Sequence, residues 1–138
     1  MHGYRMANLD AIPPVGDHGL PIDAAWLPVR HHLGIDAFGI NAYAASHPGQ
    51  VVIEEHDEAD LGHQELYFVA RGRAEFTVGE ASREAPGGTF VLYEDPALRR
   101  KAVSLEPGTT IVAVGAEPGR AFSPSEWETR RTASLPTG

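Results

Sequence analysis

The sequence predicts an all-β protein, an antiparallel β-barrel or sandwich formed by a single domain. Its 138 residues fit one domain of ordinary size. Fifteen glycines and eleven prolines divide the chain into short segments, and β-prone segments at a spacing of roughly 8–12 residues are typical of sandwiches and barrels. Cysteine is absent, which excludes a disulfide framework and a thiol nucleophile, and the 42% apolar share is sufficient for a core.

The barrel is predicted to span residues 33–122. Residues 63–78 are expected to form a hairpin around a tight turn at residues 71–73, because two β-prone runs flank that turn. Alternating apolar and polar residues, or runs rich in β-branched and aromatic residues, predict the strands. These are residues 38–43, 51–56, 63–70, 74–78, 89–93, 101–105 and 109–115.

Both ends of the chain are predicted to lie outside the barrel. Residues 1–32 contain too many prolines and glycines for a continuous element, and we expect an irregular arm that packs on the barrel. Trp26 and Leu27 are its expected anchors, since a large aromatic side chain in a polar arm usually fills a groove. Residues 123–138 are predicted to form one helical turn capped by Ser125, followed by a flexible tail.

The charge balance excludes two classes of partner. Eleven basic and nineteen acidic residues give a net charge of −8, which argues against nucleic acid and anionic membranes as partners. No run of apolar residues approaches the ~20 that a membrane span needs, and no signal peptide is recognisable. We therefore expect a cytoplasmic protein.

Acidic residues and histidines are concentrated between residues 54 and 65. Side chains two apart on a strand share a face, so His63, Glu65 and Tyr67 are expected to lie together. The same rule groups Glu54 with His56 and Glu58. Six carboxylates fall in this segment, namely Glu54, Glu55, Asp57, Glu58, Asp60 and Glu65.

These residues suggest a metal site. If His56, His63 and Glu65 converge inside the barrel, imidazole and carboxylate donors would suit one divalent transition metal, namely iron, manganese, nickel or zinc. The alternative is that residues 54–60 form a solvated acidic loop. Glu65 stands in an otherwise apolar strand, where a buried carboxylate costs several kcal/mol unless it is paired. Its expected partner is a metal or Arg99.

Residues 37–122 resemble the cupin superfamily, whose fold is a small double-stranded β-helix barrel. The first cupin motif reads Gly, five residues, His-x-His, three or four residues, Glu, six residues, Gly. Glu65 and Gly72 stand at the spacing of its second half. The resemblance therefore implies a cupin barrel with a small-molecule ligand inside it.

Two alignments fit the first half of this motif. In one, His56 and Glu58 occupy the His-x-His element, with Glu58 in place of the second histidine. In the other, which has no gap, Ala59 and Leu61 take these positions and His63 serves as a substitute ligand. The sequence leaves both alignments open.

The second cupin motif has lost a metal ligand. Counted from Gly88, Arg99 stands where the motif has its histidine. Arginine cannot act as a metal ligand, but its fork of donors suits a carboxylate. Residues 29–43 are similar to short actinobacterial-type cupins without established activity. Within them His31 and His32 are expected at the surface, the alternative being that one enters the barrel mouth.

Three functions follow as hypotheses. The first is a metal-dependent enzyme of oxygenase or isomerase type. His56, His63 and Glu65 would hold the metal, and Tyr67 or Glu58 would transfer a proton.

The second hypothesis is a metal-free ligand-binding or sensor module in which Glu65 pairs with Arg99. Its pocket would be largely apolar. The expected lining is Arg99, Tyr67, Val69, Phe76 and Phe90.

The third hypothesis is a dimeric scaffold module that uses the outer face of the barrel. Leu66 and Phe68 point away from Glu65 along their strand and need cover. A homodimer is expected in each case.

Overall fold

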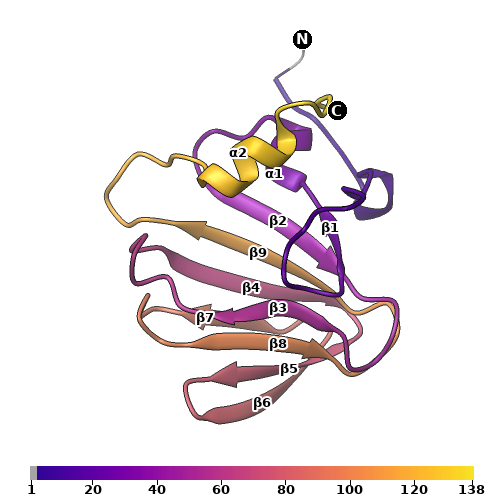
Figure 1. The fold of residues 1–138 in the computed structure, drawn as a ribbon, viewed down its shortest axis with the longest axis vertical. Helices are drawn as coiled ribbons and strands as arrows, with labels where there is room; N and C mark the ends of the chain where they lie inside the picture. The colour runs from indigo at the N-terminus through magenta and orange to yellow at the C-terminus, as the bar shows by residue number, and fades with distance from the viewer. Residues whose placement is uncertain (1–2) are drawn as a thin grey trace.

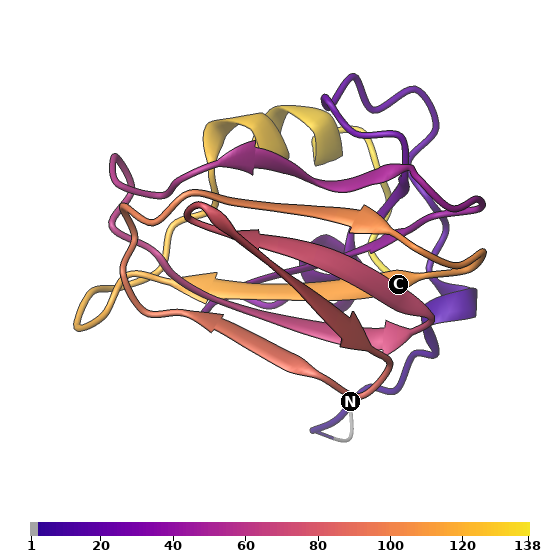
Figure 2. The same cartoon turned by 90° about the horizontal axis from the view of Figure 1, so that it is seen from below.

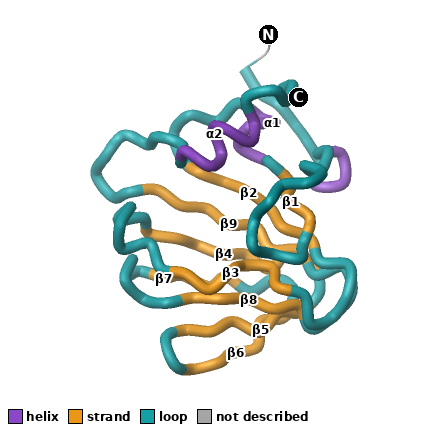
Figure 3. The backbone as a smooth tube through the Cα atoms, in the orientation of Figure 1, coloured by secondary structure: helices purple, strands orange, loops and turns teal. Residues whose placement is uncertain are grey.

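The computed structural model describes residues 3–138 and shows two antiparallel β-sheets facing each other (Figures 1 and 3). One sheet has the strand order β1-β2-β9-β4-β7, and the other has the order β3-β8-β5-β6. This arrangement confirms the predicted all-β class. The strands are β1 (Ala25–Leu27), β2 (Gly39–Ala44), β3 (Val51–His56), β4 (Gln64–Arg71), β5 (Arg73–Val78), β6 (Ala81–Pro86), β7 (Phe90–Tyr93), β8 (Arg100–Ser104) and β9 (Thr110–Ala116).

The seven predicted strands are all present, with ends shifted by at most one residue. Two strands were not predicted. Strand β1 is short and lies in the arm, where it pairs with β2. Strand β6 pairs only with β5 at the edge of its sheet, and Ala85 is its one buried residue. An edge strand exposed along most of its length carries no apolar alternation, so the pattern that predicts the other strands is missing there.

The predicted hairpin over residues 63–78 is wrong. Strand β4 pairs with β7 and β9, whereas β5 pairs with β6 and β8 in the opposite sheet. The chain therefore crosses between the sheets at Gly72, which has φ +77°. A Cβ atom there would overlap Thr109. Glycine is thus required both for its backbone conformation and for this close approach.

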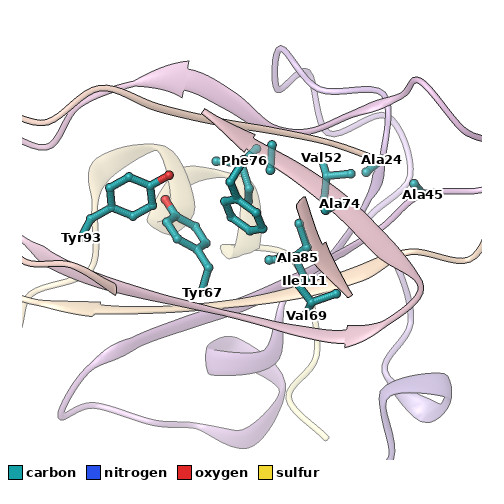
Figure 4. Close-up of a cluster of buried hydrophobic side chains, with 12 residues drawn as sticks. Ala24, Ala45, Val52, Tyr67, Val69, Ala74, Phe76, Ala85, Tyr93 and Ile111 are labelled. Atoms are coloured by element: carbon teal, nitrogen blue, oxygen red, sulfur yellow. The ribbon is translucent and has the colours of Figure 1, made fainter. Parts of the chain in front are cut away.

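The core lies between the two sheets (Figure 4). Alternation along β4 points Tyr67 and Val69 inward, and Phe76 meets them from β5. The rings of Tyr67 and Tyr93 pack edge to face with centroids 5.6 Å apart. Burying each such large side chain stabilises the fold by roughly 1.5–3 kcal/mol.

The two helices lie on one side of the barrel (Figures 1 and 3). Helix α1 spans Val29–Leu33, and a single 3₁₀ turn, η1, spans Leu9–Ala11. Helix α2 spans Glu126–Thr132 and is thus longer than the predicted single turn. Ser125 is its N-cap residue but makes no side-chain capping hydrogen bond. Within residues 3–138, no helix is both long and apolar enough to cross a membrane, and the cytoplasmic location stays a prediction.

The C-terminal tail differs from the expected flexible segment. The Gly138 amide donates to the His32 carbonyl at 2.8 Å, and His31 Nε2 bonds the Leu135 carbonyl at 2.8 Å. Both histidines lie on α1, so the tail runs back to this helix. Figure 2 shows the fold from below, with α2 in yellow at one side of the sheets. Neither histidine lines the main pocket described below.

Candidate functional site

A pocket of about 390 Å³ opens between the sheets on the side covered by α2. Strands β2, β3, β4 and β9 supply its walls, and residues of α2 border it. Its lining brings together Glu54, His56, Glu58, His63, Glu65 and Tyr67, which come from the acidic segment and the strand that follows it. The expected convergence of this segment inside the barrel is therefore present.

Three groups form the centre of the site: His56, Glu58 and Glu65. The imidazole Nε2 of His56 lies 3.6 Å from Glu58 Oε2 and 3.6 Å from Glu65 Oε1. Strand β3 ends at His56, Glu58 follows in the connecting loop, and Glu65 lies on β4. One ligand atom from each residue lies within 4.8 Å of the others. We call these three residues the His–Glu cluster.

The orientation of His56 is fixed by the backbone. Its Nδ1–H donates to the Glu54 carbonyl at 2.7 Å. In a neutral ring this leaves the lone pair on Nε2, which faces both carboxylates. A ring nitrogen held by a backbone acceptor is typical of metal-binding histidines, although the same geometry also serves an imidazolium that donates to a carboxylate.

The predicted pairing of Glu65 with Arg99 is wrong, and the neighbouring arginine takes that place. Arg100 is fully buried, and its Nη1 donates to Glu65 Oε1 at 2.9 Å. Arg99 is half-exposed and lies 3.8 Å from carboxylate oxygens of Glu55 and Asp57. The reason is the alternation of side chains along a strand. Arg100 pairs with His56 across β8 and β3, so both side chains point to the inner face and the adjacent Arg99 points to the outer face.

Arg100 is held on several sides. Its Nη2 donates to the carbonyls of Asp95, Pro96 and Leu98 at 3.2, 3.3 and 2.9 Å. Its guanidinium also lies 4.4 Å from the centre of the Tyr93 ring. The buried charge is thus both paired and hydrogen-bonded, as a charge without water must be.

Glu65 is the most strongly bonded carboxylate of the cluster. Burial alone would raise its pKa, but the nearby His56 imidazole, the hydrogen bond from Tyr67 and the charge of Arg100 together lower the pKa below its usual range. The Tyr67 hydroxyl donates to Glu65 Oε1 at 2.5 Å. Burial and the adjacent Glu65 charge raise the pKa of Tyr67 well above 10, so its proton stays in place.

Glu58 has the opposite character. Burial and repulsion from Glu65 raise the pKa of Glu58 to about 7. His63 Nδ1 lies 3.5 Å from Glu58 Oε1, on the side away from His56. His63 lines the pocket but is not a member of the His–Glu cluster, where Glu58 takes the place predicted for it. This arrangement agrees with the alignment in which Glu58 replaces the second histidine of the motif.

Of the residues predicted to line the pocket, Tyr67 lies in its lining. Val69 and Phe76 are buried in the core beyond the pocket and do not line it. Phe90 is 66% exposed, and its ring packs against Phe68 on the outer face with centroids 4.6 Å apart. Phe90 pairs directly with Phe68 across β7 and β4, so the two must share that face. The predicted homodimer through this outer face stays a prediction.

A second buried network, not predicted, holds α2 against the barrel. Trp26 Nε1 donates to Asn41 Oδ1 at 3.0 Å, and Asn41 Nδ2 donates to Glu128 Oε1 at 2.9 Å. Arg30 Nε donates to the other oxygen of Glu128. The rings of Trp26 and Trp127 pack edge to face at 5.2 Å. An acid in the first turn of a terminal helix resembles ordinary dipole compensation, so sequence gave no sign of these partners.

The donor set of the His–Glu cluster fits a divalent transition metal. One imidazole with its proton fixed on the far nitrogen and two carboxylates is a combination suited to iron, manganese or zinc. Glu65 keeps Oε2 available, since the hydrogen bonds from Arg100 and Tyr67 fall on Oε1. These three residues would hold the metal.

Solved structures similar to this chain define its fold. A cupin 2 conserved barrel domain protein from Salinispora arenicola aligns with a TM-score of 0.65 at 17% identity, covering 96% of this chain and 98% of that one. An uncharacterised protein with a double-stranded β-helix domain from Klebsiella pneumoniae aligns with a TM-score of 0.62 at 21% identity, covering 86% and 94%. A cupin protein from Bacteroides fragilis gives 0.62 at 12% identity, covering 91% and 93%.

The chain therefore has the cupin fold, as its resemblance to the superfamily implied. No protein-family model matches the sequence, and no curated protein is significantly similar to it. At these identities the structural likeness concerns the fold, because one fold hosts many chemistries.

Proposed function

We propose that this protein binds a small molecule in its barrel pocket and that a divalent metal is held there by the His–Glu cluster. The observation that supports this most strongly is the convergence of the His56 Nε2 atom and two carboxylates around one position. Three electron-rich groups that converge in a half-buried site are stabilised by a proton or a cation among them, and a metal ion would satisfy all three at once.

The residues around the cluster have separable roles in this proposal. Glu54 orients the His56 ring through its backbone carbonyl, and Tyr67 with Arg100 orients Glu65. A bound divalent metal would supply Lewis-acid polarisation of an oxygen atom of the small molecule. His63 borders the pocket and lies within 3.5 Å of Glu58, where it can accept or return a proton.

The test is metal analysis of protein purified without a histidine tag or chelator. We expect near-stoichiometric iron, manganese, nickel or zinc, and a rise in melting temperature when the chosen metal is returned to stripped protein. Glu58→Gln should weaken metal binding at least about tenfold. Glu55→Gln is the matched control, because Glu55 is half-exposed on β3 next to His56 and lies outside the cluster. Absence of metal together with no thermal response to any of the four ions would overturn the metal site.

A second candidate is a metal-free binding module, and the Arg100–Glu65 pair favours it. Glu65 already has a buried cationic partner at 2.9 Å and a hydroxyl donor at 2.5 Å. With a proton on His56 or Glu58, the pocket needs no further cation. In that case Glu65→Gln should change the affinity for a small-molecule ligand while metal content stays at zero in both proteins.

A further inference from the structure

The pocket that contains the His–Glu cluster also has a basic border. Arg130 and Arg131 line it from α2, next to Trp127. The protein has a net charge of −8 and only eleven basic residues. Two of these few basic residues therefore lie next to each other at a pocket that also contains several carboxylates. The lining of one pocket thus combines the carboxylates of the His–Glu cluster with two arginines.

Arg131 is held in place while keeping donor capacity. Its Nε donates to the His18 carbonyl at 2.7 Å, and its Nη1 donates to the Trp127 carbonyl at 3.3 Å. The guanidinium carbon lies 5.9 Å from the centre of the Trp127 ring. Within residues 3–138 its Nη2 makes no hydrogen bond. A guanidinium fixed by backbone acceptors, with one amino group remaining, is preorganised for an anion.

Arg130 is weakly engaged. Its one ion pair in the described chain is with Glu126, at 3.5 Å, and both side chains are mostly exposed. Such pairs contribute little and exchange readily for a better acceptor. Glu128, the other acid of this helix at the pocket, is paired with Arg30 and accepts a hydrogen bond from Asn41, so it does not compete for Arg130 or Arg131.

We propose that the ligand of this pocket is a small organic carboxylate, bound with its carboxylate against Arg131 and Arg130 and its other end toward the His–Glu cluster. This inference rests on the proposed function of the pocket as a small-molecule site. The acidic cluster repels a carboxylate and the arginines attract it, so the charges set one orientation. Ile22, Tyr43 and Trp127 add apolar surface to the lining of the same pocket. A volume near 390 Å³ lies toward the small end of ligand pockets, which run from about 300 to 1,000 Å³.

The test uses three probes that differ at one end: 3-phenylpropanoate, its neutral amide, and phenethyl phosphate. Binding is followed by NMR shifts of the Trp127 indole and by calorimetry, with and without added Zn²⁺. We expect the carboxylate to bind at least about tenfold more tightly than the amide, since a charge-assisted hydrogen bond is lost with the charge. Arg131→Gln should remove this preference, and Arg130→Gln should reduce it by a smaller factor.

Arg120→Gln is the matched control, because Arg120 is exposed, pairs with Glu117 and does not line the pocket. If Arg131→Gln is less stable than the wild type, Arg131→Lys tests the same point, since it keeps the charge and loses the fixed plane. The proposal would be overturned if 3-phenylpropanoate did not bind, if it bound no more tightly than its amide, or if the phosphate bound more tightly. It would also be overturned if the preference for the carboxylate were unchanged in both Arg131→Gln and Arg130→Gln. Metal binding is measured separately in each variant, so loss of the metal site and loss of carboxylate selectivity are distinguishable.

Discussion

Two buried carboxylate–arginine pairs in this protein differ in how completely they are satisfied. Glu128 has both oxygens bonded, one to Arg30 and the other to Asn41. Glu65 shares its site with His56 and with Glu58, whose pKa is raised to about 7. At Glu128 the carboxylate–arginine pair stabilises the fold, because each of its carboxylate oxygens has a hydrogen-bond partner. At Glu65 a neighbouring like charge is present, so a proton or a cation at that site can exchange more readily.

The largest expected effect is on the structural pair. Arg30→Ala leaves Glu128 buried without its cation and should lower the free energy of unfolding by about 3–5 kcal/mol. Urea denaturation at pH 7 measures it, with Arg120→Ala as the exposed control. A loss below about 1 kcal/mol would show that α2 is not held by this pair.

The pair in the pocket should be less costly to break. Arg100→Met keeps most of the buried volume, and Glu65 retains Tyr67 and His56 as partners. We expect a loss of about 2–4 kcal/mol in the free energy of unfolding, because the carbonyls of the 95–98 loop also lose their donor. The same variant should bind divalent metal more tightly than wild type, since a competing cation is removed. Unchanged or weaker metal binding would contradict that competition.

The pH dependence separates the two pairs further. Burial and repulsion from Glu65 raise the pKa of Glu58 from 4.5 to about 7, so between these values the folded protein keeps a proton that the unfolded chain releases. Stability attributable to Glu58 therefore falls as pH rises from about 5 to 7, by about 1–2 kcal/mol after allowing for solvent screening.

The measurement is urea denaturation of metal-free protein between pH 5 and 8. Glu58→Gln should flatten this part of the profile, and Glu55→Gln should follow the wild type. His56 contributes a loss of stability in the same direction. Burial opposes protonation of His56, but Glu65 and the Glu54 carbonyl outweigh burial and raise its pKa. The stability that protonated His56 contributes below pH 6.5 is therefore lost as the pH rises above that value. A profile unchanged by Glu58→Gln would remove Glu58 from this role.

The smallest effect is expected at Arg99. Its contacts with Glu55 and Asp57 are 3.8 Å long and half-exposed. Arg99→Gln should change the free energy of unfolding by less than about 0.5 kcal/mol. A loss comparable to that of Arg100→Met would contradict the assignment of Arg100 as the inward residue.

The strands of the barrel could be predicted from sequence because local alternation encodes which face is buried. The inward direction of Glu65 and Tyr67 followed from the same rule. The choice between Arg99 and Arg100 did not, since no alternation marks where β8 begins and a shift of one residue exchanges its faces. The link between Asn41 and Glu128 spans 87 residues, and no local pattern predicts a contact of that separation.

The edge-to-face contact of Trp26 with Trp127 joins strand β1 to the helix that borders the pocket. These are the only two tryptophans in the chain. The intrinsic tryptophan fluorescence of the protein therefore originates where α2 contacts the barrel. A change in its intensity or wavelength reports how α2 packs on the barrel rather than whether the opposite sheet is intact.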